Sequence, residues 1–230
     1  MERTPVLPRY ILTGTPGAGK TAILRQLEQD GYATVEEAAT DVIALQQALG
    51  IPEPWRDPGF IDRILDLQHR RQTAADARAS GSAADARASG SAAADARALG
   101  SAADEPALCA VSDALAQGAT ADRTARGVVF FDRSPVCTLA LSRYLGLAPS
   151  RALRDEIDRL QTQRLYDRSV FFVRNLGFVE ATAARRISFD EAMAFERLHE
   201  LAYLQLGFDL VEVPAGPLAA RVALVREMLG

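Results

Sequence analysis

The stretch Gly14-Thr-Pro-Gly-Ala-Gly-Lys-Thr21 decides the fold of this 230-residue chain. It matches the pattern G-x-x-x-x-G-K-[ST], in which glycines let the backbone wrap around phosphate groups and turn its N–H groups toward them. The β-prone run 9–13 precedes the pattern, and the apolar spacing of a helix follows it from Lys20 to Asp30. Because the motif requires this strand–turn–helix context, we predict a phosphate-binding loop, the P-loop.

Lys20 is the only lysine among 26 basic residues. A lysine ammonium is a compact point charge and a guanidinium is a wide planar fork, so the single lysine indicates a position that arginine does not fill. We predict that Lys20 reaches the β- and γ-phosphates of a nucleotide and that the Thr21 hydroxyl ligates Mg²⁺. The other loop residues, whose backbone would surround the phosphates, are Gly14, Thr15, Pro16, Gly17, Ala18 and Gly19.

Composition places the chain among ordinary globular proteins. Apolar residues make up 48% and charged residues 24%, and the formal net charge is -4. A nucleic-acid partner would favour a basic surplus, and no apolar run approaches the roughly 20 residues of a membrane span. The N-terminus lacks a signal-peptide pattern, and Cys109 and Cys137 are too few for a disulfide framework. We therefore expect a cytoplasmic protein with reduced thiols and a single domain, 1–230.

Short apolar β-prone runs alternate with helical patterns along the chain. The runs are 9–13, 32–35, 127–131, 169–173 and 208–213. The helical patterns cover about 38–49, 58–74, 135–145, 151–166 and 189–206, with a last helix beginning at Pro217. Ser150 is typical of a helix N-cap, and Ser188 with Glu191 matches a capping box. This alternation predicts an α/β fold with a parallel sheet and helices on both of its faces.

Residues 74–124 contain an internal repeat. The unit Ala75–Ala83 recurs at 84–92 and, with one leucine, at 94–102. The unit has almost no large apolar side chain to bury, so packing cannot offset the entropy lost on ordering. Alanine favours helix, whereas Gly81, Gly90 and Gly100 interrupt it. We expect a flexible or weakly helical insertion.

Asp132 directly follows the buried run 127–131. The second acidic motif of P-loop proteins has this position and holds Mg²⁺, so we predict that role for Asp132; an N-cap or a salt-bridged loop carboxylate is the alternative. Motor-type ATPases carry glutamate at the next position, where this chain has Arg133. A guanine-binding Asn-Lys-x-Asp motif is excluded because the only lysine is in the P-loop. Both observations favour a small-molecule kinase that uses ATP.

Several motifs occur in a familiar order: the P-loop, Val35–Ala39, Trp55–Pro58, Phe130–Ser134 and Ala184–Ala192. In this the chain resembles the AAA-labelled predicted ATPase family related to ribosylnicotinamide kinase domains, and more distantly thymidylate and deoxynucleoside kinases. The resemblance covers most of the chain apart from about 74–124. It implies a three-layer α/β/α P-loop NTPase fold with a five-stranded parallel sheet in the order 2-3-1-4-5.

By this resemblance, Glu37 is the candidate general base that accepts a proton from the substrate hydroxyl. Glu36 competes for this role because the register of the second strand is open by one residue. The alternative for Glu37 is a carboxylate that stabilises a helix N-terminus. Arg133 matches a family arginine near the transferring phosphoryl group, with a structural salt bridge as the alternative.

The resemblance also places a lid-like segment at 175–188. Its Arg185 and Arg186 would stabilise the transition state on closure, unless they are a solvated basic pair. Arg174 is a weaker lid candidate. The acceptor substrate would bind near Trp55, Arg56 and Phe60, although a lone tryptophan equally suits the core.

The sequence thus predicts an ATP- and Mg²⁺-dependent phosphotransferase that acts on a nucleoside-like or other small hydroxyl substrate. Its partners would be the nucleotide and an unidentified small-molecule acceptor, with no nucleic acid. Two alternatives stay open. One is a nucleotide-binding regulatory ATPase with slow hydrolysis and a protein or lipid partner, and the other is a catalytically inactive family member.

Overall fold

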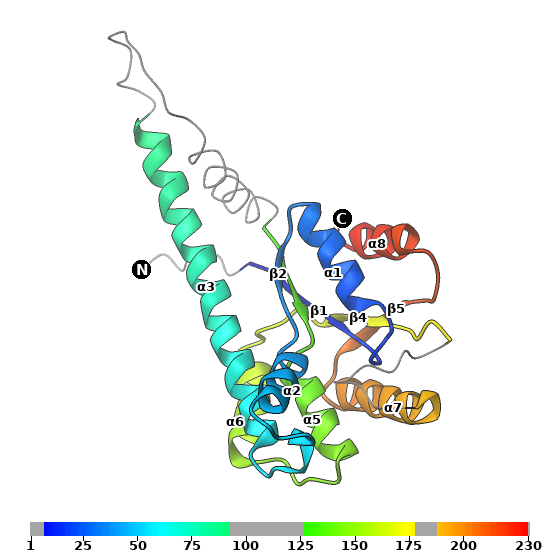
Figure 1. Cartoon of the computed structure of the whole chain (residues 1–230). Coiled ribbons are helices and arrows are strands. Elements are labelled where there is room, and N and C mark those ends of the chain that lie inside the picture. The colour runs from blue at the N-terminus through cyan, green and yellow to red at the C-terminus, as the bar shows by residue number, and fades with distance from the viewer. Residues whose placement is uncertain (1–6, 93–126, 178–187, 230) are drawn as a thin grey trace, which may run out of the picture.

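A computed structural model describes residues 7–92, 127–177 and 188–229. Its centre is a five-stranded sheet in the order β2-β3-β1-β4-β5, and all neighbouring strands pair in parallel. Figure 1 shows the sheet between two layers of helices, which confirms the expected α/β fold and strand order. The strands are β1 (Arg9–Thr13), β2 (Ala33–Val35), β3 (Val129–Asp132), β4 (Ser169–Val173) and β5 (Asp209–Val213).

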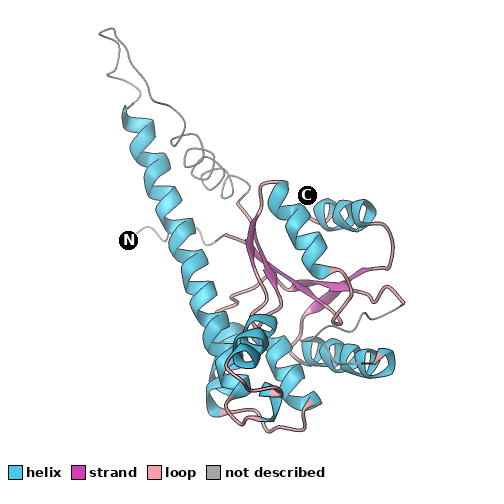
Figure 2. Ribbon diagram, viewed as in Figure 1, coloured by secondary structure: helices cyan, strands magenta, loops and turns pink. Residues whose placement is uncertain are grey.

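Apart from α3, the helices of the described ranges lie where the sequence patterns predict them. Figure 2 shows them in cyan around the magenta sheet. They are α1 (Lys20–Gln29), α2 (Ala39–Ala48), α3 (Phe60–Ala92), α5 (Pro135–Tyr144), α6 (Arg151–Thr162), α7 (Phe189–Gln205) and α8 (Leu218–Glu227), with a short 3-10 helix η1 (Pro54–Arg56). The Ser150 hydroxyl caps α6, and Ser188 forms the expected capping box with Glu191 at the start of α7. None of the helices in these ranges is long and apolar enough to cross a membrane.

Alternate residues of the central strands point to opposite faces of the sheet, so each strand contributes to two cores. Leu12 and Phe130 pack with α1 and α8 on one face. Ile11 and Phe131 pack with α2, α3, α5, α6 and α7 on the other. Because both faces are covered, the strands read as continuous apolar runs in the sequence.

Helix α3 is longer than the sequence pattern predicts. The apolar spacing indicates an end near residue 74, whereas the helix continues to Ala92 through Gly81 and Gly90. The ion pair of Asp76 with Arg9 ties part of this extension to β1. Alanine, the strongest helix former, occurs so often here that it outweighs the cost of about 1 kcal/mol for each glycine. The rest of the repeat insertion, from residue 93, lies outside the described residues.

The sheet order determines where a ligand can bind. β1 lies between β3 and β4, so the loop after β1 lies between the loops that follow those two strands. In open parallel sheets, ligands bind at the carboxyl ends of the strands where the strand order reverses direction. The P-loop and Glu37 follow carboxyl ends of strands, and Asp132 is the last residue of β3, so all three lie at this edge.

Candidate functional site

Glycines give the P-loop its shape. Gly14, Gly17 and Gly19 have φ values of 129°, 84° and 82°, in the region that side chains disfavour. A Cβ atom on Gly14 would lie 2.1 Å from the carbonyl oxygen of Val173 on β4. Helix α1 begins directly after Gly19, so its free N–H groups and the positive end of its dipole are available to an anion.

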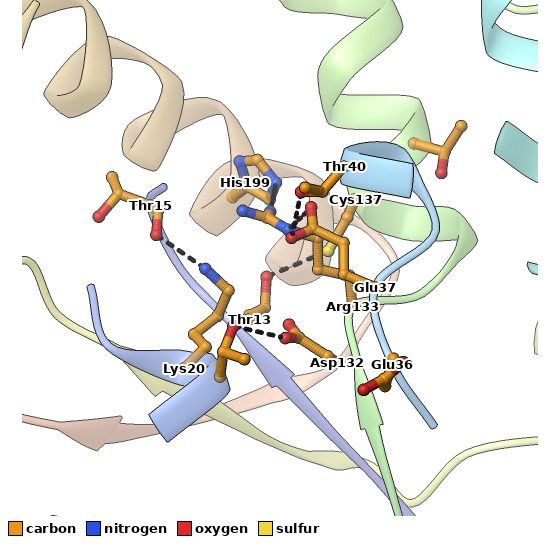
Figure 3. Close-up of polar contacts among 12 residues, drawn as sticks. Thr13, Thr15, Lys20, Glu36, Glu37, Thr40, Asp132, Arg133, Cys137 and His199 are labelled. Carbon is orange, nitrogen blue, oxygen red and sulfur yellow. Dashed lines mark hydrogen bonds and ion pairs between the residues drawn. The ribbon is translucent and has the colours of Figure 1, made fainter. Parts of the chain in front are cut away.

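Lys20 lies within the predicted phosphate site. Its side chain is buried, and Nζ donates a hydrogen bond of 2.8 Å to the carbonyl oxygen of Thr15 across the loop (Figure 3). Burial, followed by the charge of Arg133, lowers the pKa of Lys20 to about 8, although Asp132 and Glu37 act in the opposite direction. A phosphate group would supply the negative charge that favours the ammonium form.

Thr21 and Asp132 form the expected pair of oxygen donors. Thr21 Oγ1 lies 3.4 Å from Asp132 Oδ2. Within the described part of the chain, the buried Oδ1 of Asp132 has no hydrogen-bond partner. Burial raises the pKa of Asp132 to about 6, and the nearby charge of Lys20 opposes that increase. The N-cap of α5 is Ser134, so Asp132 does not serve as that cap. A hydroxyl beside a carboxylate with an orphaned oxygen fits Mg²⁺, which prefers oxygen ligands.

Glu37, rather than Glu36, faces this site. Oε1 of Glu37 forms an ion pair of 2.6 Å with Nε of Arg133, and Oε2 accepts a hydrogen bond of 3.2 Å from Thr40. Glu36 is exposed, and Figure 3 shows it apart from the cluster. The structural salt bridge considered for Arg133 therefore exists, and its partner is the candidate base itself.

Arg133 is held in place from several directions. Its backbone has a φ of 69°, unusual for a residue with a side chain, and its N–H donates to the Leu12 carbonyl. Nη1 lies 3.0 Å from Nε2 of His199 on α7. The guanidinium is thus held between the Glu37 carboxylate, with which it forms an ion pair, and His199, which accepts a hydrogen bond from it.

The pKa of His199 is lowered to about 3, first by burial and then by the charge of Arg133. The ring is therefore neutral at pH 7. Its Nδ1 lies 2.9 Å from the carbonyl oxygen of Phe195, so Nδ1 carries the hydrogen and Nε2 accepts from Arg133. No sequence pattern indicates this role, since 66 residues separate His199 from Arg133.

A cavity of about 740 Å³ adjoins the P-loop. Lys20, Thr21, Glu37 and Arg133 are among the residues that line it. Its lining also includes many aromatic and aliphatic side chains: Ile43, Trp55, Phe60, Ile64, Leu141, Tyr144, Leu145 and Phe195. Of the predicted acceptor residues, Trp55 and Phe60 line the cavity, whereas Arg56 is exposed and pairs with Glu53 at 2.9 Å.

Of the three lid candidates, the structure describes only Arg174. Arg185 and Arg186 are outside the described residues. Arg174 forms ion pairs with three glutamates, Glu196 at 3.1 Å, Glu200 at 3.2 Å and Glu212 at 2.5 Å. The charge of Arg174 is thereby engaged in joining α7 to β5, away from the P-loop lysine.

Comparison with known proteins agrees with this geometry. No curated protein matches the chain. A family model described as "AAA domain" matches residues 9–83 and 86–221. The match covers the P-loop, Glu37, Asp132, Arg133 and all five strands. The chain therefore belongs to this AAA-domain family of P-loop proteins.

Proposed function

We propose that the chain is an ATP- and Mg²⁺-dependent phosphotransferase whose acceptor is a nucleoside-like or other small hydroxyl compound. One observation carries the proposal: a single cavity of about 740 Å³ is lined by Lys20 and Thr21 of the P-loop, by Glu37, and by a set of apolar side chains. A protein that only hydrolyses ATP has no need for an apolar space of this kind beside the phosphates. The kinase relationship suggested by the sequence motifs supports the same reaction.

The roles follow from the contacts. Lys20 and the P-loop N–H groups would bind the phosphates, and Thr21 with Asp132 would hold Mg²⁺, which neutralises charge on the phosphate oxygens. Arg133 pairs with the Glu37 carboxylate at 2.6 Å and would hold it in position. As the acceptor oxygen bonds to the γ-phosphorus, the bond to the ADP oxygen breaks and Glu37 takes the hydroxyl proton. Arg185 and Arg186 would close over the phosphoryl group.

The test is ADP release from Mg-ATP with and without acceptors, across a panel of nucleosides, nucleoside analogues, sugars and amino alcohols. We expect at least one acceptor to raise the rate. Glu37→Gln should abolish this increase while ATP still binds, and Glu36→Gln, the matched control, should retain it. Tight ATP binding with the same slow release for every acceptor would refute the transferase and favour a nucleotide-binding regulatory protein.

A further inference from the structure

Arg221, in the first turn of α8, contacts the backbone of the P-loop. Its side chain is 4% exposed. Nη2 donates a hydrogen bond of 2.7 Å to the carbonyl oxygen of Ala18 in the loop, and a longer one of 3.3 Å to the carbonyl of Arg174 after β4. The guanidinium thus joins the loop after β1 to the loop after β4, although no sequence motif includes it.

The bond to Ala18 has a consequence for the phosphate side of the loop. A trans peptide unit directs its C=O and the following N–H in opposite directions. Because the Ala18 carbonyl points to Arg221, the N–H of Gly19 points away from it, toward the inner side of the loop. Inward N–H groups of this kind are what a P-loop offers to phosphates.

The close approach depends on Gly19. A Cβ atom at this position would lie 2.9 Å from Nη1 of Arg221. Glycine is therefore required at position 19 for two reasons. Its φ is 82°, and a side chain would take the space of the Arg221 guanidinium. The positive charge consequently lies against the backbone of the loop, one residue before Lys20.

The positive charge of Arg221 has no ion-pair partner in the described part of the chain. No carboxylate there forms an ion pair with Arg221, and its Nε is buried without a hydrogen-bond partner. Arg174 provides the contrast, since it is more exposed yet has three glutamate partners. An unpaired buried charge is costly, which indicates that the compensating anion belongs to a ligand.

We propose that Arg221 is a positioning residue for the phosphate chain of the nucleotide. It fixes the Ala18–Gly19 peptide in the phosphate-binding orientation, and it adds a second positive charge to that of Lys20. The inference rests on the nucleotide-binding part of the proposed function and is independent of the acceptor. It predicts that Arg221 contributes more to affinity as the number of ligand phosphates rises.

The experiment measures dissociation constants of ATP, ADP and AMP with Mg²⁺ by calorimetry. Arg221→Gln keeps a donor for Ala18 without the charge, whereas Arg221→Lys keeps the charge. Arg226→Gln is the matched control, because Arg226 lies on the same helix, is half-exposed and pairs with Asp30 at 3.6 Å. Wild-type affinity for ATP tests the proposed function by itself, and the differences among variants test the role of Arg221.

We expect Arg221→Gln to weaken ATP binding about tenfold and AMP binding by less, since the interaction grows with ligand charge. Arg221→Lys should weaken ATP binding less than Arg221→Gln does. The control should match the wild type. ATP affinity of Arg221→Gln within about twofold of wild type, equal losses for ATP and AMP, or equal losses in the two variants would overturn the inference.

A second measurement avoids substitution at this position. In the wild-type chain, the ¹⁵N resonance of Arg221 Nε should shift on binding, in the order ATP, ADP, AMP from largest to smallest. An unchanged resonance at saturating ATP would also overturn the inference.

Discussion

The neutral ring of His199 accepts a hydrogen bond from the cation of Arg133, with 3.0 Å between Nε2 and Nη1. Both side chains are buried, so neither can exchange this partner for water. The same guanidinium forms an ion pair with Glu37, with 2.6 Å between Nε and Oε1. His199 therefore controls the direction of the carboxylate that we propose as the general base, without reaching the substrate.

Replacement of His199 tests this control. His199→Leu should reduce acceptor-dependent kcat about tenfold, since the guanidinium loses an acceptor and the Glu37 pair loosens, while the Kd for ATP stays unchanged. His199→Gln, whose side-chain oxygen can accept from Arg133, should recover part of the loss. His69→Leu, at the other histidine, is the control. Equal losses of kcat in the Leu and Gln variants would indicate a packing role only.

The pH dependence of Mg-ATP binding should have two limbs. Mg²⁺ requires ionised Asp132, whose pKa is raised to about 6, and the phosphates favour protonated Lys20, whose pKa is lowered to about 8. Affinity should therefore rise from pH 5 to 7, by roughly tenfold for the carboxylate alone, and fall above pH 8. Calorimetry from pH 5 to 9 measures both limbs. Asp132→Asn should weaken Mg-ATP binding. It should also remove the part of the rise in affinity between pH 5 and 7 that exceeds the titration of ATP itself. An unchanged rise would contradict the assignment.

Lys20→Arg keeps a positive charge and should still lose phosphate affinity. The buried position of Lys20 accommodates a compact ammonium that spans the loop to Thr15, and a guanidinium is too wide for it. We expect ATP to bind at least about tenfold more weakly. In the wild type, amine-reactive labelling should be confined to Lys20 and the N-terminus, and Mg-ATP should protect Lys20. Labelling that saturating Mg-ATP leaves unchanged would contradict the predicted contact.

Gly14→Ala should destabilise the protein strongly. The new Cβ would overlap the Val173 carbonyl, and a φ of 129° is reached almost only by glycine. We expect the free energy of unfolding to fall by more than about 3 kcal/mol in urea titrations. Gly146→Ala is the control, because its φ is 67° and its Cβ meets nothing within 4 Å, so about 1 kcal/mol is expected. Equal costs at the two positions would refute the close approach of the P-loop to β4.

The sequence predicts those parts of the site that lie in short local patterns. The P-loop is contiguous and Asp132 ends a continuous apolar strand, so their positions in the fold can be predicted without knowledge of any contact. The choice between Glu36 and Glu37 was open because a shift of one residue in a strand turns a side chain to the opposite face. Only the placement of β2 beside β3 resolves it.

Other parts of the site depend on packing between distant elements. His199 meets Arg133 across 66 residues, and Arg221 meets Ala18 across 203. A histidine and an arginine on helices have no spacing rule that reveals such partners. The apolar pattern predicts too early an end for α3 for a related reason. Helix preferences in an alanine-rich repeat add up over many residues, whereas a pattern of apolar positions marks only the part of the helix that packs.

The connection between α3 and β3 joins the fold at the edge opposite the cavity. The described chain leaves α3 at Ala92 and resumes at Gly127, just before the amino end of β3, whereas the phosphate site lies at the carboxyl ends (Figure 1). Repeated DNA gains and loses copies by replication slippage. At this edge, such changes in copy number would leave the spacing of Lys20, Asp132 and Glu37 in space untouched. A change in the number of repeat units is therefore compatible with an unchanged phosphate site.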